Sequence, residues 1–265
     1  MEQIERTLER LNQKYIWDNE PVFCFTSDID WASESVMQKY FELLEPYNLP
    51  LTLFCTHESK EIIKSRYEKG IHPNFLPRSS QRMGEMNDFN IRGYYDGIIQ
   101  NCLKIVPDAD VFRSHRAFSI TDICHLLKEK YHFAYCSNDI TIMQTGIKPV
   151  LHESGLINFP VFFEDGTHLY NKLDFDFKKY LKYFTSPGIK IISFHPMHFV
   201  FNSPDFMWMR NLKDSMTSIQ YQNLVIEKLH EASMCGGIRN TIIDIIEFAK
   251  SNYKIYSLKE LYEMV

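Results

Sequence analysis

The sequence predicts a single α/β domain built from repeated strand–helix units, arranged either as a barrel or as an open doubly wound sheet. Short apolar runs alternate with longer segments of helical spacing along the whole length. The apolar runs are continuous rather than alternating in polarity, which is typical of parallel strands covered on both faces. No linker, low-complexity tract or internal repeat divides the 265 residues, and we therefore expect one domain over 1–265.

The expected strands follow one another at regular intervals. In chain order they are residues 22–25, 51–55, 70–72, 110–113, 133–137, 157–162, 190–194 and 254–256. Between them, apolar residues recur every three or four positions and predict helices. One such stripe includes Tyr94, Ile98 and Cys102, and another begins at Ile238, directly after the breaker Gly236-Gly237.

Residues 202–234 are the least regular part of the chain. They follow an expected strand and contain the apolar cluster Phe206, Met207, Trp208 and Met209. We expect a helical insertion here. Two interpretations stay open for its aromatic and methionine side chains, a lid over a bound substrate and ordinary core packing.

Charge and composition exclude several classes of protein. The formal net charge is -5 and no basic stripe is present, so no nucleic-acid partner is expected. The start, MEQIERTLERLNQKY, lacks the apolar core of a signal peptide, and no apolar run is long enough to span a bilayer. The six cysteines show neither C-x-x-C nor zinc-finger spacing. These features predict a reduced, cytoplasmic protein without a membrane span.

Polar side chains of the types that occur in catalytic and metal sites follow most of the expected strands. In parallel βα folds the carboxyl ends of the strands share one face, so these side chains are expected to meet there. The acids of "DID" follow the first strand. In chain order, the residues at the strand ends are Asp28 and Asp30, then His57, His72, Arg113 with His115, Glu164 with Asp165, and His195 with His198.

Together these residue types predict a metal-dependent hydrolytic centre. Aspartate and histidine ligands with an open position are typical of a catalytic Zn²⁺ or a similar divalent ion. Such an ion lowers the pKa of bound water to roughly 7 and polarises a carbonyl. Asp30 is expected to bind the metal and Asp28 to accept a proton from its water, while a histidine opposite protonates a leaving amine.

Structural alternatives exist for each of these residues. Asp28 and Asp30 could cap a helix that begins near Ser33, because acids favour helix amino termini. His72 precedes a proline and could be a turn residue, and Trp31 could pack in the core rather than stack on a sugar. The sequence contains no nucleophile elbow, phosphate-binding glycine loop or dinucleotide fingerprint.

In their order and spacing the motifs resemble those of the polysaccharide deacetylase (NodB-homology) family, carbohydrate esterase family four. The family's Thr-Phe-Asp-Asp strand end is similar to "FTSDID", its His-Ser/Thr-x-x-His motif to "HPNFLP", and its Arg-x-Pro motif to "RSH". The acid of its fourth motif is similar to that of "FFED", and its Leu-x-x-Ile-x-x-His-Pro motif to "IKIISFHP". The resemblance covers the chain from Val22 to Leu261 and implies a distorted (β/α)7 barrel.

The resemblance also implies a role for each site residue. The catalytic set is Asp28 as base, Arg113 as its brace, Asp165 as the fourth-motif acid and His195 as general acid; the metal ligands are Asp30 and His72. The family's second metal histidine is replaced by Leu76. His57 is expected to complete the ligand set, with Asn74 or water as alternatives. Substrate contacts are expected from Trp31, His115 and His198.

The function implied by the resemblance is a metal-dependent hydrolase that removes an N-acetyl or related acyl group from an amino sugar. "GIHPNF" and "SFHPMH" resemble the members linked to O-antigen and related surface-sugar biosynthesis, which implies a surface-polysaccharide precursor as substrate. The expected metal is Zn²⁺, with Co²⁺, Ni²⁺ or Mn²⁺ as alternatives. Two other functions stay open: an amide hydrolase acting on a non-sugar substrate, and a catalytically inactive sugar-binding protein, which the missing histidine favours.

Overall fold

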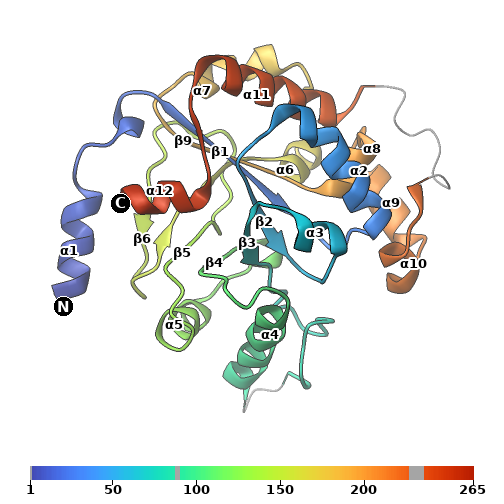
Figure 1. Ribbon diagram of the computed structural model, residues 1–265, viewed down its shortest axis with the longest axis horizontal. Coiled ribbons are helices and arrows are strands. Elements are labelled where there is room, and N and C mark those ends of the chain that lie inside the picture. The colour runs from blue at the N-terminus through green and yellow to red at the C-terminus, as the bar shows by residue number, and fades with distance from the viewer. Residues whose placement is uncertain (1, 87–89, 227–235) are drawn as a thin grey trace.

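The strands form one strongly curled sheet, and helices surround it (Figure 1). The computed structural model describes residues 2–86, 90–226 and 236–265. Within these residues the strands are β1 (Pro21–Asp28), β2 (Leu51–Cys55), β3 (Glu68–Ile71), β4 (Val111–Phe112), β5 (Tyr135–Cys136), β6 (Val150–Leu151), β7 (Ile157–Asn158), β8 (Val161–Glu164), β9 (Gly188–Phe194) and β10 (Ile255–Tyr256). Their order is β6-β7-β5-β4-β3-β2-β1-β9-β8, with β10 beside β1.

The sheet closes on itself into a distorted barrel. All strand pairs are parallel except β6 with β7. β7 pairs with β5, and β8 pairs with β9, so the segment that contains both strands joins the two ends of the sheet. Ile140, just after β5, also forms a parallel bridge with Val161 of β8. The ring therefore has seven parallel positions, occupied by β1 to β5, the β7–β8 segment and β9.

One expected strand differs from the observed one. We predicted a single strand over 157–162, whereas the structure interrupts it between β7 and β8 and continues the second part to Glu164. The interruption contains Pro160, which has no N–H to donate to a neighbouring strand. The short strand β6 was not predicted. The other expected strands are all present, with ends that differ by a few residues.

The helices cover the outside of the curled sheet (Figure 1). They are α1 (Glu2–Leu11), α2 (Glu34–Leu44), α3 (Lys60–Lys64), α4 (Ile91–Ile105), α5 (Thr121–Glu129), α6 (Asp165–Tyr170), α7 (Leu181–Phe184), α8 (Pro196–Phe201), α9 (Phe206–Asp214), α10 (Ser218–Gln222), α11 (Ile238–Asn252) and α12 (Leu258–Met264). Short 3-10 turns are η1 (Ile16–Asp18), η2 (Glu45–Tyr47), η3 (His115–Ala117) and η4 (Phe177–Tyr180). The helices predicted from apolar stripes are α4 and α11.

The expected insertion at 202–234 contains α9 and α10, which lie together at one edge of the molecule (Figure 1). Residues 227–235, the end of this stretch, lie outside the described residues. That the stretch is an insertion stays a prediction. Its apolar cluster is divided: Met209 is buried, while Met207 is 56% exposed.

Alternate residues of the strands face opposite sides of the sheet, as the pleat requires. On β1, Phe23 and Phe25 belong to the core between sheet and helices, whereas Val22 and Cys24 belong to a second cluster inside the barrel. Leu258 and Leu261 of α12 complete the inner cluster. The barrel interior is therefore apolar at the amino ends of the strands, and α12 covers that end.

Helix α12 is held there by local signals and by polar contacts. Ser257 Oγ accepts a hydrogen bond from the backbone N–H of Glu260, and Glu260 Oε2 accepts one from the backbone N–H of Ser257. This reciprocal pair is a capping box, which satisfies amide donors at the start of a helix. The Tyr262 ring stacks on the Tyr135 ring of β5 at 4.5 Å between centroids. Closure of this end leaves the carboxyl ends of the strands as the open face.

In the described part of the chain, no helix is both long and apolar enough to cross a bilayer. Cys24, Cys55 and Cys136 are buried free thiols, as their positions in apolar runs predict. Burial raises the pKa of Cys24 and Cys136 well above the ordinary value.

Truncation of Leu261 tests the role of α12 as the cover of the barrel. Leu261 is fully buried, so Leu261→Ala is expected to lower the free energy of unfolding by about 2–5 kcal/mol, measured by urea denaturation. Leu8→Ala on α1, where the side chain is 44% exposed, is the matched control and is expected to cost less than about 0.5 kcal/mol. Equal losses in the two variants would contradict this packing.

Candidate active site

The open face of the barrel carries a buried arginine that touches several strand ends. Arg113, directly after β4, has a side chain only 1% exposed. Its guanidinium donates to five oxygens of β1, of β9 and of the residue after β5: Thr26 Oγ1 at 2.9 Å, Asp28 Oδ1 at 2.8 Å, Ser193 Oγ at 2.7 Å, Ser137 O at 2.6 Å and Ser137 Oγ at 2.7 Å. It also lies 4.4 Å from the centroid of the Phe54 ring. All three guanidinium nitrogens therefore donate inside the barrel, away from solvent.

Asp28 is the carboxylate that this arginine holds. It is the last residue of β1, follows the inward-facing Thr26 by two positions, and is buried. Its Oδ1 atom is fixed by Arg113, and the residue lines the pocket described below. A buried charge needs such a partner, because an unpaired carboxylate in a low-dielectric interior is costly. The helix-capping alternative for the two acids does not apply, since Ser33 Oγ accepts from the Val36 N–H and caps α2.

Asp30 lies at a sharp backbone turn and faces two histidines. Asp30 and Trp31 both have positive φ angles, 39° and 56°, a conformation that costs L-residues roughly 1–2 kcal/mol each. Asp30 Oδ1 lies 3.3 Å from His72 Nε2 and 3.0 Å from His115 Nδ1. Burial alone would raise the pKa of Asp30, but the two histidines and His195 more than offset it and hold that pKa well below its usual range.

These three residues form a donor set that fits a divalent metal ion. One oxygen and two imidazole nitrogens lie within 4.8 Å of one another, on residues that are buried or half-buried. His72 Nδ1 donates to the carbonyl of Arg113 at 2.7 Å, so Nε2 is the ring nitrogen that faces Asp30. A ligand histidine fixed through its other ring nitrogen is the usual arrangement at metal sites. The set has the composition of a catalytic centre that keeps open positions.

The expectation that His57 completes the metal set is not met. Its Nε2 donates to the carbonyl of Ala32 at 2.9 Å, and its Nδ1 bonds to Thr56 Oγ1 at 2.9 Å. Both ring nitrogens are therefore engaged away from Asp30. The third position is held instead by His115, which we had expected to contact substrate. Asn74, the other alternative, accepts from the Leu76 N–H at 3.2 Å and is not in the set.

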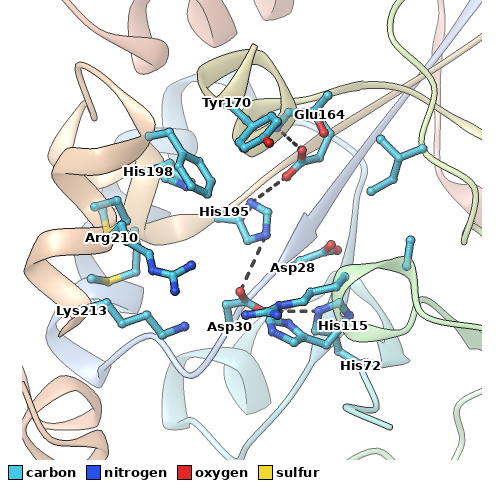
Figure 2. Close-up of a pocket in the computed structure, with 18 of the residues that line it drawn as sticks. Asp28, Asp30, His72, His115, Glu164, Tyr170, His195, His198, Arg210 and Lys213 are labelled. Atoms are coloured by element: carbon cyan, nitrogen blue, oxygen red, sulfur yellow. Dashed lines mark hydrogen bonds and ion pairs between the residues drawn. The ribbon is translucent and has the colours of Figure 1, made fainter. Parts of the chain in front are cut away.

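His195 and Asp165 form a second buried pair. His195 Nδ1 donates to Asp165 Oδ1 at 2.6 Å, and the backbone N–H of His195 donates to Asp165 Oδ2 at 2.7 Å. His195 Nε2 then points at Asp30 Oδ2, 3.9 Å away (Figure 2). Burial alone would lower the pKa of His195, but the carboxylates of Asp165, Asp30 and Glu164 raise it well above the ordinary value. Burial and the Asp165 charge raise the pKa of Glu164 to about 7.

Of the other two residues expected to contact substrate, His198 lines the pocket and Trp31 does not. His198 lines the pocket, with Nδ1 in a hydrogen bond to Ser203 Oγ at 2.9 Å, and burial lowers its pKa to about 4, so it is neutral. Trp31 packs its ring edge-to-face on His115, with 5.4 Å between the centroids. It is half-buried against the core, and the residues that line the pocket do not include it.

All the catalytic and metal candidates except His57 meet in one pocket or, for Asp165, directly behind it. The pocket has a volume of about 590 Å³, within the range of small-molecule sites (Figure 2). Its lining also includes Arg116, Tyr170, Arg210 and Lys213, to which no sequence motif pointed. The available signal was the three-residue spacing of Arg210 and Lys213, which places them on one helix face.

The family comparison identifies one match. Residues 25–213 match the family described as WbmS-like polysaccharide deacetylase. No curated protein matches the chain.

Solved structures of similar fold include WbmS of Bordetella bronchiseptica, an inferred polysaccharide deacetylase involved in O-antigen biosynthesis. It has 24% sequence identity and a TM-score of 0.69, and the match covers 85% of this chain and 90% of that one. The Bc1960 peptidoglycan N-acetylglucosamine deacetylase matches with 12% identity, 91% and 88% coverage and a TM-score of 0.45. The peptidoglycan deacetylase PdaC of Bacillus subtilis matches with 11% identity, 94% and 93% coverage and a TM-score of 0.44. The likeness to WbmS shows that the barrel has the polysaccharide deacetylase fold.

The paired state of His195 can be tested by NMR titration of metal-free protein. We expect the His195 pKa well above about 6.5 in the wild type and a fall in Asp165→Asn, because the carboxylate partner is lost. Since the folded-state pKa is raised, the stabilisation from this pair is present below about pH 6.5 and is lost as pH rises through the folded-state pKa. The half-buried His125 on α5 is the internal control, and Asp165→Asn should leave its signals unchanged. An ordinary His195 pKa in the wild type would contradict the arrangement.

Proposed function

The chain belongs to the WbmS-like polysaccharide deacetylase family, and we propose that it is a metal-dependent hydrolase that removes an N-acetyl or related acyl group from an amino sugar. The observation that carries the proposal is the meeting of three paired groups in one pocket. Asp28 is paired with Arg113, Asp30 with two histidines, and His195 with Asp165. A base, a metal-binding set and an acid are the components of amide hydrolysis.

In the proposed enzyme, Asp30, His72 and His115 hold the divalent metal, and Zn²⁺ suits two imidazoles and one carboxylate. The bound ion would supply Lewis acidity to the amide carbonyl and lower the pKa of water. His115 replaces the family's second metal histidine, since the position four after His72 is Leu76. Metal binding therefore does not require the usual His-x-x-x-His spacing, because two loops after different strands supply the histidines.

Asp28 is the proposed general base. Arg113 holds its Oδ1 and so orients the other carboxylate oxygen, which accepts the proton of the attacking water. Thr26 on β1 and Ser193 on β9 accept hydrogen bonds from the guanidinium nitrogen of Arg113 that also binds Asp28. The strands therefore hold the arginine, and through it the base, in a fixed orientation. The fixed orientation lowers the entropic cost of reaching the reactive geometry.

His195 is the proposed general acid. Its proton at Nε2 faces the pocket, because Nδ1 is bonded to Asp165, and the raised pKa keeps both nitrogens protonated near neutral pH. It donates the Nε2 proton to the departing amine as the carbon–nitrogen bond breaks. Asp165 holds the ring in position and stabilises its positive charge.

A surface-polysaccharide precursor is the substrate class that we propose, and support comes from the family match together with the WbmS likeness. A panel that contrasts N-acyl amino sugars with cyclic ureides and formyl amides tests this against the non-sugar amide alternative. The alternative of an inactive binding protein rested on the missing histidine at Leu76. His115 beside Asp30 removes that ground.

The metal content of the purified protein tests the ligand set directly. Elemental mass spectrometry should find near-stoichiometric metal in the wild type and in His57→Ala, and little in His72→Ala or His115→Ala. The reason is that only the latter two histidines direct a nitrogen at Asp30. Loss of metal in His57→Ala with retention in His115→Ala would overturn the assignment. Protein free of metal even after Zn²⁺, Co²⁺ or Ni²⁺ is added would overturn the metal centre itself.

Two isosteric substitutions separate the roles of the neighbouring acids. Asp28→Asn is expected to retain metal while kcat falls by about 10²–10⁴-fold, because only the base is lost. Asp30→Asn is expected to lose both metal and turnover, because an amide oxygen is a weaker ligand than a carboxylate. Amine release from an N-acyl sugar and metal content are measured on the same samples. Normal turnover by either variant would show that the roles are wrongly assigned.

A further inference from the structure

The pocket has a cationic wall that the proposed hydrolysis does not use. Arg210 and Lys213 lie three residues apart on α9 and both line the pocket. Figure 2 shows their side chains directed from the helix toward Asp30 and His195. Lys213 Nζ also lies 5.3 Å from the centroid of the Tyr221 ring, which holds it on the pocket side of α9. Both residues are exposed enough for a ligand to reach them.

A third cation lines the pocket from another part of the barrel edge. Arg116 is in η3, which follows β4, whereas α9 lies beyond β9. Three strands, β3, β2 and β1, separate β4 from β9 in the sheet. Arg116 and the next residue, Ala117, both have positive φ angles, 60° and 52°. Two adjacent residues in this costly conformation need compensation, and such strain is concentrated at functional sites.

The acidic groups of the pocket do not account for these cations. Asp28 is held by Arg113, and Asp30 is held by His72 and His115. Arg210 bonds Asp214 through Nε alone, at 3.2 Å, so its other guanidinium donors remain for a ligand. Among residues 2–86, 90–226 and 236–265, neither Lys213 nor Arg116 forms an ion pair. Asp214 and Glu164 also line the pocket, and Asp214 pairs with Arg210, so Lys213 and Arg116 are the lining cations that have no carboxylate partner within the described residues.

We propose that Lys213, Arg210 and Arg116 form a subsite for a negatively charged group on the carbohydrate substrate. This inference rests on the proposed function for the identity of the substrate as an N-acyl sugar. A sugar carboxylate and the diphosphate of an activated sugar share the required chemistry, a compact anion with several acceptor oxygens. The reacting amide then lies at the Asp30 centre while the anion reaches toward α9.

The rest of the pocket suits a sugar ring between these two ends. Met197, Phe206, Met209 and Tyr221 provide apolar walls, and Tyr170, with 68% exposure, offers an open ring surface. A volume of about 590 Å³ accommodates one or two sugar units. Charge at one end and an amide at the other would orient a small substrate in one direction. The anion subsite therefore acts on specificity and is separate from the chemical step.

Direct binding to the metal-loaded protein tests the subsite. The probes are N-acetylglucosamine, its C6-carboxylate analogue, and UDP-N-acetylglucosamine, measured by calorimetry at low and high salt. We expect a charged probe to bind about tenfold or more tightly than the neutral one and to weaken as salt rises. Lys213→Gln and Arg116→Gln should each weaken only the charged probe, by about threefold to fivefold, as expected for exposed ion pairs. Whichever charged probe shows the larger loss identifies the source of the anion.

Controls separate the subsite from other effects of charge. Lys64→Gln, on α3 and outside the pocket, should leave all three affinities unchanged. Metal content is checked in each variant, because the metal itself attracts anions. Equal affinity for neutral and charged probes, or equal losses in Lys64→Gln and Lys213→Gln, would overturn the subsite. Variants that weaken only the binding of acetate would show that the cations hold the released acyl anion, which also overturns it.

Amine release from the same probes separates this inference from the proposed function. Turnover of the neutral and charged sugars with equal KM would refute the subsite and leave the deacetylase intact. Charge-selective binding without amine release from any N-acyl probe would refute the proposed function and leave the subsite. Charge-selective binding together with amine release at a lower KM for the charged sugar would support both the subsite and the proposed function.

Discussion

The buried contact between Arg113 and Asp28 is the interaction on which the rest of the site depends. Enclosing both charges inside a barrel costs several kcal/mol per ion, and the cost is offset because the guanidinium meets five acceptor oxygens. Removing one partner of such a pair typically costs about 3–5 kcal/mol, since the other charge is left unpaired. The carbonyl of Arg113 also orients His72. One residue thus positions both the proposed base and a proposed metal ligand.

Three carboxylates at the same barrel edge acquire different roles from their different partners. Asp28 meets a guanidinium, Asp30 meets imidazole nitrogens, and Asp165 meets the imidazolium of His195. Burial alone would raise the pKa of Asp30 and Asp165, and their cationic neighbours lower it in both cases. Environment rather than residue type therefore distinguishes the three carboxylates, to which we assign the roles of base, metal ligand and supporting acid, while the carboxyl ends of parallel strands bring all three together.

The sequence predicted which residues lie at the site better than it predicted which partners their side chains contact there. Asp28, Asp30, His72, Arg113 and His195 could be predicted because each follows an apolar strand, and strand ends share a face. His57 and His115 satisfy the same rule equally well. They differ because the His57 ring forms a hydrogen bond to the carbonyl of Ala32, whereas the His115 ring faces Asp30. Both contacts join residues far apart in the chain. The sequence around each histidine therefore does not predict which partner its ring contacts.

The sequence by itself determined the parallel strands, the covering helices and the residue types at the strand ends, because apolar periodicity and residue chemistry are local properties. Only the tertiary structure decided that the strand expected over 157–162 is two strands that close the ring, that His115 rather than His57 joins Asp30 and His72, and that the cations of α9 face the pocket. These outcomes depend on how strongly the sheet curls and on where loops between distant strands return. Such geometry arises from contacts between distant segments of the chain, which no short stretch of sequence contains.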